Sequence, residues 1–261
     1  MLRRPKKLVK LVTFDALHTI ITPRLPIHEQ YSRVFSPYVG DLDPTKIKQS
    51  FRVALKCVQK EHPFYNKGAQ NWWQDVIRRT AIGAGADEKA LDAHLAEITR
   101  KLMKRFSSDE GYKVFEDTLT TISRLREQTD IKTAIISNGD TRLRSVLESL
   151  NLTTLFDAII LSEEEGVEKP SPKIFERTLQ MVNQNIVEHE GSIRPSQCLH
   201  VGDELVSDYQ GASNVGWHAL LLRRTGADGE QEHKEHGEDL KGIQTISSLG
   251  GVINWIQTGE V

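Results

Sequence analysis

The sequence predicts an α/β fold: a Rossmann-like, doubly wound parallel sheet with an inserted α-helical domain. Three observations support this prediction. From residue 112 onward, short apolar runs alternate with amphipathic segments of helical period, which is typical of repeated βα units. Residues 24–110 contain no strand pattern of any length. The apolar run at residues 8–15 stands alone before that stretch, so it must pair with the later strands.

The alternating part predicts its elements in order. Strands are expected at residues 132–137, 158–161, 197–201, 218–222 and 243–246. Helices are expected at residues 117–127, 142–150, 171–182, 207–215 and 249–256. Together with the first strand, these elements assign residues 1–22 and 112–261 to the α/β core.

The insert at residues 23–111 is predicted to be an α-helical cap that follows the first strand. Asp43 and Pro44 are residue types favoured at the N-cap and at the first position of a helix. Asp87 precedes another segment with apolar residues at helical spacing. Because the insert interrupts the sheet, we expect it to act as a lid that closes over a pocket and excludes water.

Length and charge exclude several classes of function. A chain of 261 residues can bury a sizeable core without a disulfide or a structural metal. A net charge of -2 and a pI near 6.5 offer no general attraction to nucleic acid or to an anionic membrane. Cys57 and Cys198 are expected to be reduced thiols. No apolar run approaches the ~20 residues of a membrane span. We expect an intracellular, cytoplasmic protein with a small-molecule substrate; the oligomeric state cannot be read from the chain.

Two charged stretches leave alternatives open. The basic run at residues 3–7 is typical of a solvated terminus, and nuclear import is the alternative. Residues 223–242 lack an apolar period, which predicts a surface loop. Within that loop, His233 and His236 could suggest a metal site. A solvated segment is favoured instead, because no cysteine accompanies them.

Four short segments place a polar side chain at the end of a predicted strand or the start of a helix. These side chains are Asp15, Ser137, Lys169 and Asp203. Singly, each also fits a turn, a helix cap or a solvated surface group. In an open parallel sheet, however, such positions share one crevice at the carboxyl edge. The four segments together therefore predict an active site.

The same segments resemble the motifs of the haloacid dehalogenase-like superfamily of hydrolases. The resemblance implies that Asp15 is the nucleophile, which forms a covalent ester that water later cleaves. It implies that the Ser137 hydroxyl binds a phosphoryl oxygen. Lys169, in a Lys-Pro-Ser-Pro sequence, would neutralise Asp15 and the charge that develops on the transferred group.

The resemblance also implies a Mg²⁺ site. Its ligands would be the Asp15 carboxylate, the backbone carbonyl of Leu17 and the Asp203 carboxylate, which are the oxygen donors that Mg²⁺ prefers. Asp208 follows the Gly-Asp pair at residues 202–203, and we expect it either to support the metal or to orient Lys169 and Asp203.

The first motif departs from the family's phosphatases. They carry Asp-x-Asp-x-Thr, commonly with Gly before the Thr, whereas this chain has Leu17 for the second acid and His18 for the Gly, followed by Thr19. The missing acid would protonate the leaving alcohol and activate water, and leucine can do neither. His18 is a conceivable replacement, although a packing role for it is favoured.

Four residues are the candidate contacts to the substrate: Thr19, Asn138, Trp72 and Trp73. The two tryptophans cannot point in one direction on a helix, so one is expected in the core of the cap and the other along the pocket.

These features predict a slow Mg²⁺-dependent phosphatase for a small phosphate ester. The alternative is a catalytically silent protein that binds a phosphometabolite or a partner. A 2-haloacid dehalogenase is disfavoured, because the tyrosine of that branch is missing and the acidic Gly-Asp pair is retained. The chain is similar over nearly its whole length to the haloacid dehalogenase-like hydrolase domain-containing protein 3 group, which also lacks the second acid.

Overall fold

The computed structural model describes residues 9–65, 68–127, 131–186, 191–226 and 237–260. The chain divides into two compact units. The core unit comprises Met1–Thr22, Val114–Gly139 and Leu152–Val261. The helical unit comprises Pro23–Lys113 and Asp140–Asn151.

The core unit is built on a six-stranded sheet in the order β5-β4-β1-β6-β7-β8, with all neighbours parallel. Its strands are β1 (Leu11–Phe14), β4 (Lys132–Ser137), β5 (Ala158–Leu161), β6 (Cys198–Gly202), β7 (His218–Leu222) and β8 (Thr245–Ile246). The strand order requires crossovers in both directions from β1, which confirms the predicted doubly wound sheet. Every residue of β1 is buried, as expected for a strand covered on both faces.

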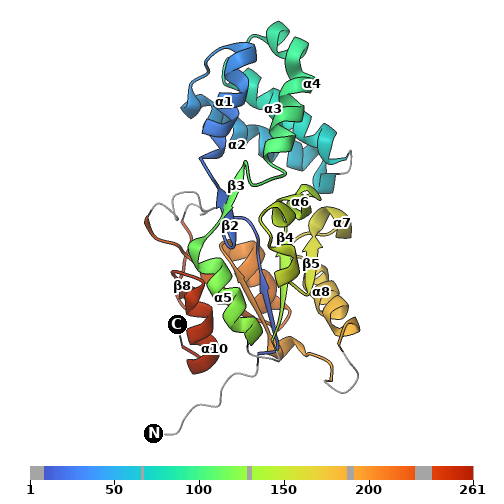
Figure 1. Ribbon diagram of the computed structural model, residues 1–261, viewed down its shortest axis with the longest axis vertical. Helices are drawn as coiled ribbons and strands as arrows, with labels where there is room; N and C mark the ends of the chain where they lie inside the picture. The colour runs from blue at the N-terminus through green and yellow to red at the C-terminus, as the bar shows by residue number, and fades with distance from the viewer. Residues whose placement is uncertain (1–8, 66–67, 128–130, 187–190, 227–236, 261) are drawn as a thin grey trace. The chain divides into compact units, whose positions relative to one another are not determined.

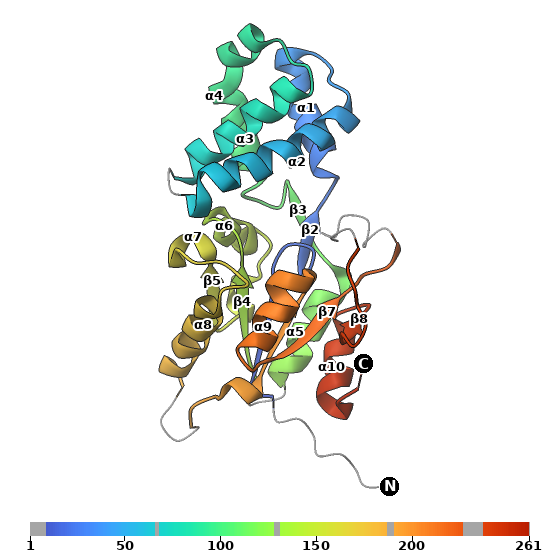
Figure 2. The same ribbon diagram turned by 180° about the vertical axis from the view of Figure 1, so that it is seen from behind.

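Helices cover both faces of this sheet. On one face α5 (Glu116–Glu127) packs beside α10 (Gly250–Thr258), as Figure 1 shows. On the other face, towards the viewer in Figure 2, α8 (Pro172–Gln184) packs beside α9 (Gly211–Asn214). A π-helical turn, η5 (Leu205–Gln210), leads into α9, so two short elements replace the helix predicted at residues 207–215. The short helix α7 (Ser162–Glu165) follows β5.

The helical unit consists of α1 (Ile27–Val39), α2 (Pro44–Glu61), α3 (Ala69–Gly83), α4 (Glu88–Arg105) and α6 (Arg142–Ser149). Asp43 caps α2, where its carboxylate accepts from the Thr45 amide at 2.8 Å. Asp87 caps α4 by accepting from the Ala90 amide at 2.9 Å. Both cap predictions are confirmed. The sequence did not predict α1, which contains Pro37.

The short strands β2 (Ile21–Pro23) and β3 (Tyr112–Val114) pair with each other at two of the points where the chain passes between the units. Three 3₁₀ turns complete the described structure: η1 (Pro63–Tyr65), η2 (Thr153–Leu155) and η4 (Pro195–Gln197).

One part of the chain groups differently from the predicted division, which placed residues 112–261 together. Asp140–Asn151 belongs to the helical unit. The reason lies in side-chain contacts: the Trp73 indole donates to Asp140 at 2.6 Å, and the Arg142 guanidinium lies 4.5 Å from the centre of the Trp73 ring. Such long-range contacts have no local sequence pattern.

No helix among the described residues is both long enough and apolar enough to cross a membrane. The basic run at residues 3–7 and the pair His233 and His236 lie outside the described residues.

Candidate active site

Three buried charged side chains meet at the carboxyl edge of the sheet in the core unit. The Lys169 ammonium donates to Asp15 Oδ1 and to Asp208 Oδ1, both at 2.6 Å. The Lys169 and Asp208 side chains are only 2% and 1% exposed, and Asp15 is 12% exposed. One ammonium group thus joins two acids that lie 154 and 39 positions away from Lys169 in the sequence. The site carries one positive and two negative charges when all three groups are ionised.

Burial and the neighbouring charges shift the pKa values of all three groups. Burial raises the pKa of Asp15 to about 7, with Lys169 opposing the rise and Asp208 adding to it. Burial alone would lower the pKa of Lys169, but the attraction of Asp15 and Asp208 outweighs it and raises that pKa. Burial alone would likewise raise the pKa of Asp208; Lys169 and His200 outweigh it and hold the pKa below its usual range. Lys169 is therefore charged, and Asp15 is the group that titrates near neutrality.

Asn138 fixes the backbone of Lys169. Its side-chain carbonyl accepts from the Lys169 amide at 2.7 Å, and its side-chain NH₂ donates to the Lys169 carbonyl at 2.9 Å. These two bonds hold the loop before α8 against the end of β4. The sequence predicted Asn138 as a contact to the substrate, which stays a prediction, whereas its role in positioning Lys169 was missed.

Gly202 makes room for Asp208. A Cβ atom at Gly202 would lie 2.2 Å from the carboxylate of Asp208, so any side chain there would displace the acid. Asp208 Oδ2 accepts from the Glu204 amide at 2.9 Å, and Oδ1 already accepts from Lys169. Both oxygens of Asp208 are thus bonded within the protein, and the contact with Lys169 fits the second of the two roles expected for it; both roles stay predictions.

Asp203 follows β6 directly and is 2% exposed. Its backbone carbonyl accepts from the Arg223 guanidinium, which also pairs with Glu238 at 2.5 Å. Arg223 comes directly after β7, the neighbouring strand. Arg223 was not predicted as part of the site; its position at a strand end, like that of Asp15, was the available signal.

The loop after Asp15 forms a tight turn. The amides of Thr19, Ile20 and Ile21 all bond the Ala16 carbonyl. His18 has a φ of 63°, a left-handed conformation that favours glycine, which explains why the resembled motif commonly has Gly there. Leu17 is partly exposed, and its carbonyl accepts no hydrogen bond from the described part of the chain. The turn thus leaves the backbone oxygen two residues after Asp15 unbonded by any described residue.

Arg224 anchors the end of this loop. It bonds the Thr19 carbonyl at 2.9 Å and both oxygens of Asp117 at 3.0 Å, and it lies 3.7 Å from the centre of the Phe115 ring. Asp117 in turn accepts from the Leu249 amide at 2.8 Å. Thr19 is fully buried, so its predicted contact with a substrate stays a prediction.

Ser137 is the last residue of β4 and is 5% exposed. The register pairs Phe14 of β1 with Ile135 of β4, so Ser137 ends its strand one residue beyond the position opposite Asp15. The structure therefore brings Asp15, Ser137, Lys169, Asp203 and Asp208 to one edge of one sheet, as the spacing of the motifs predicted.

The two tryptophans lie on α3 in the helical unit. Trp72 is buried against Val58 and Val76, and its indole donates to the His62 carbonyl at 2.8 Å. Trp73 bonds Asp140 and borders a cavity of about 30 Å³, which is room for little more than water. Trp72 is thus a core residue of this unit, and a substrate contact of either ring stays a prediction.

Comparison with known proteins decides the family. A model of the haloacid dehalogenase-like hydrolases matches residues 9–216. The chain belongs to this family. Haloacid dehalogenase-like hydrolase domain-containing protein 3 of Bos taurus is 31% identical over 218 residues, which are 82% of each chain. The same protein of Danio rerio is 30% identical, over 86% of this chain and 88% of the relative. The rhythmically expressed gene 2 protein of Drosophila melanogaster is 25% identical over 97% of this chain and 96% of its own.

Solved structures show the same fold. A phosphatase of this family from Thermococcus onnurineus has a TM-score of 0.56 at 22% identity, covering 97% of this chain and 100% of its own. A putative hydrolase of the family from Bacillus subtilis, bound to magnesium, has a TM-score of 0.64 at 15% identity and covers 96% of this chain and 99% of its own. The L-2-haloacid dehalogenase of Xanthobacter autotrophicus has a TM-score of 0.63 at 18% identity, covering 95% and 98%. At these identities the likeness concerns the fold alone.

Proposed function

We propose that this hydrolase is a slow, Mg²⁺-dependent phosphatase of small phosphate esters that works through an aspartyl-phosphate on Asp15. The observation that supports this most is the Lys169 ammonium at 2.6 Å from both Asp15 and Asp208. A buried cation beside a carboxylate at a strand end is the arrangement that neutralises charge during group transfer.

The residues present fit Mg²⁺. The candidate donors are the Asp15 and Asp203 carboxylates and the Leu17 carbonyl, all hard oxygen ligands. The Leu17 carbonyl supports this fit, because no hydrogen bond from the described residues occupies it. When bound, the ion would supply positive charge that stabilises the phosphoryl oxygens.

The chain's own residues would divide the reaction as follows. Asp15 Oδ1 is held by Lys169, so Oδ2 is the oxygen placed to attack phosphorus. As the new O–P bond forms, the bond from phosphorus to the alcohol breaks and the alcohol oxygen takes a proton from solvent water. Water then attacks the phosphorus and releases Asp15. Leu17 can neither give the proton nor activate the water, which is why we propose slow turnover.

The second candidate is a catalytically silent protein that binds a phosphometabolite or a partner. The specific observation that favours it is the aliphatic side chain at Leu17. The buried triad of Asp15, Lys169 and Asp208 argues against it, because buried charges are costly to keep and cluster where chemistry is done.

The test is a steady-state assay of a panel of phosphate esters with and without Mg²⁺, on the wild type and on Asp15→Asn. We expect Mg²⁺-dependent release of phosphate that Asp15→Asn abolishes. Asp92→Asn is the matched control, because Asp92 is an exposed acid of α4 paired with Arg78. Activity that survives in Asp15→Asn would exclude this nucleophile. No activity in any variant would favour the silent binder.

A further inference from the structure

His200 is a fully buried histidine that the chemistry above leaves without a role. It lies in the middle of β6, and its exposed fraction is 0%. Its Nε2 atom is 3.0 Å from Asp208 Oδ1, the same oxygen that accepts from Lys169. Its Nδ1 atom is 2.7 Å from the Thr13 hydroxyl on β1. A continuous chain of contacts therefore runs from Thr13 through His200, Asp208 and Lys169 to Asp15.

The strand places His200 under Asp208. Side chains two residues apart on a strand point to the same face, so His200 and the missing side chain of Gly202 face the same way. A Cβ at Gly202 would collide with Asp208, which shows that this face is the one Asp208 covers. The Phe175 ring of α8 packs edge-on against the imidazole at 5.4 Å between ring centres. His200 is thus held between β1, α8 and the η5 turn with little freedom to rotate.

The partners also fix which nitrogen carries the proton. Burial lowers the pKa of His200, and the opposing hydrogen bond to Asp208 does not cancel this effect, so the ring is neutral. A neutral imidazole has one N–H, and an ionised carboxylate can only accept. The hydrogen therefore sits on Nε2 and is donated to Asp208. Nδ1 then accepts from the Thr13 hydroxyl, whose alternative partner, the Leu199 carbonyl, is further away at 3.4 Å.

We propose that His200 is a positioning residue for the hydrolytic reaction: through its Nε2–H it holds the Asp208 carboxylate at the place where Lys169 can bridge to Asp15. The inference rests on the proposed function for its kinetic readout only. Without this bond, Asp208 loses one of its three hydrogen-bond donors, which are Lys169, His200 and the Glu204 amide. The ammonium would then lose its second anchor and turn away from the nucleophile.

The test compares His200→Leu, which removes the donor but keeps an apolar side chain against Phe175, with His200→Gln, which keeps an N–H and an acceptor. We expect His200→Leu to lower kcat roughly 10- to 100-fold with KM nearly unchanged, since small misplacements of catalytic groups cost rates of this size. His200→Gln should recover most of that loss. Thr13→Val is the matched control at the far end of this series of contacts. It should lower kcat less than His200→Leu does.

A crystal structure of His200→Leu supplies a readout without turnover. We expect the Lys169 ammonium to move out of hydrogen-bond distance of Asp15, while the sheet is unchanged. If Lys169 still bridges both acids in His200→Leu, or if both variants match the wild-type kcat, the inference is wrong. If kcat and the melting temperature fall by the same amounts in both variants, His200 serves packing alone, and the inference is equally wrong. Failure of the wild type to hydrolyse any ester would refute the proposed function and leave the crystallographic test intact.

Discussion

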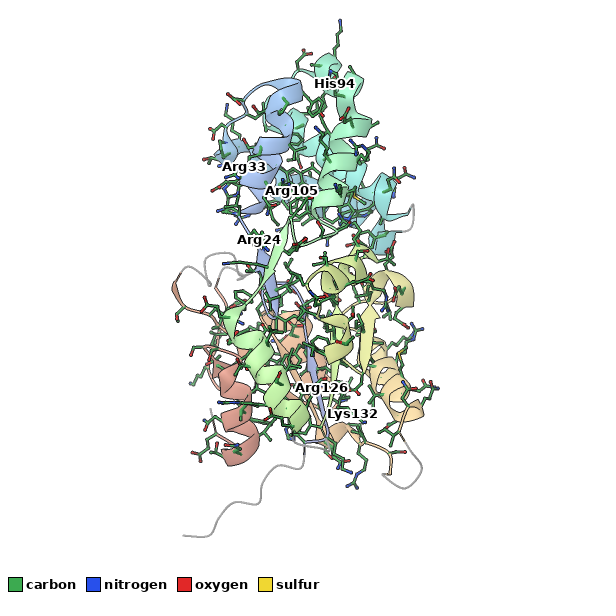
Figure 3. All side chains as sticks on the ribbon, viewed as in Figure 1. Arg24, Arg33, His94, Arg105, Arg126 and Lys132 are labelled. Carbon is green, nitrogen blue, oxygen red and sulfur yellow. The ribbon has the colours of Figure 1, made fainter. Side chains whose placement is uncertain are left out.

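The two edges of the core sheet carry ion pairs of opposite character. At the amino edge, Arg126 and Asp157 lie 3.8 Å apart with side chains 41% and 31% exposed. Figure 3 labels Arg126 together with Lys132, the first residue of β4, and both lie at this end of the core unit. At the carboxyl edge, Lys169 lies 2.6 Å from each of two acids and is 2% exposed.

The molecule thus buries charges at the carboxyl edge of the sheet and leaves them in solvent at the amino edge. An exposed pair such as Arg126 and Asp157 gains about 0–1 kcal/mol and costs little to keep. A buried cluster of one ammonium and two carboxylates must overcome the loss of water around every charge. A fold has little reason to retain such a cluster for stability alone, so its presence at one edge supports the proposed site of chemistry.

Replacing Lys169 by Met is the most severe way to break the carboxyl edge. The variant leaves two facing buried carboxylates without a cation, and we expect a loss of about 3–5 kcal/mol in the free energy of unfolding at pH 8. Urea unfolding measures it. The matched control is Lys132→Met at the other edge, which should change the stability far less. If both variants lose the same free energy of unfolding, burial does not distinguish the charges at the two edges of the sheet.

Asp15→Asn should act in the opposite direction on stability. The raised pKa of about 7 means that the stability contributed by Asp15 is full below its unfolded pKa and is lost as the pH rises through 7. At pH 8 we therefore expect the variant to be more stable than the wild type, by on the order of 4 kcal/mol. The gain should shrink as the pH falls toward 4. Thermal unfolding of both proteins across this pH range measures the gain. A gain that does not depend on pH would mean that Asp15 is not a strained buried acid.

Leu17→Asp sharpens the comparison by adding the acid that the carboxyl edge lacks. If proton transfer alone limits the rate, we expect kcat to rise, with ~10²-fold as the lower end for a positioned acid. Leu17→Asn is the matched control: asparagine has the shape of aspartate but cannot transfer the proton, so its kcat should not rise. A folded Leu17→Asp variant with unchanged kcat would indicate that His18 or the cap limits the reaction.

Arg126→Ala is the smallest change and tests the amino edge. The Arg126 side chain is exposed and also donates to the Leu155 carbonyl at 3.0 Å. We expect a change in the free energy of unfolding within about 1 kcal/mol and unchanged turnover. A drop in kcat would show that charges far from the carboxyl edge contribute to the reaction.

The parts that sequence predicted well have local physical causes. A buried strand that stops at a polar residue shows its end in the sequence, which is why the positions of Asp15, Ser137 and Asp203 followed from the pattern. The caps Asp43 and Asp87 were predictable because the bond they make spans only two or three residues.

The parts that sequence missed depend on contacts between distant segments. The Asn138 side chain bonds the Lys169 backbone across 31 residues. Arg224 bonds Asp117 across 107 residues. The helix α1 was not predicted; Pro37 lies inside it, and a proline removes a hydrogen bond from the helix interior.

Mass spectrometry of the enzyme, quenched in acid during turnover of a phosphate ester, detects the proposed aspartyl-phosphate itself. With an activated ester whose leaving group needs no proton, the missing acid at position 17 slows only the attack of water, so the intermediate should accumulate. We expect one phosphoryl group on the peptide that contains Asp15, and none in Asp15→Asn. A phosphoryl group on another residue, or phosphate release with no trace of a covalent intermediate in a quench faster than turnover, would contradict it.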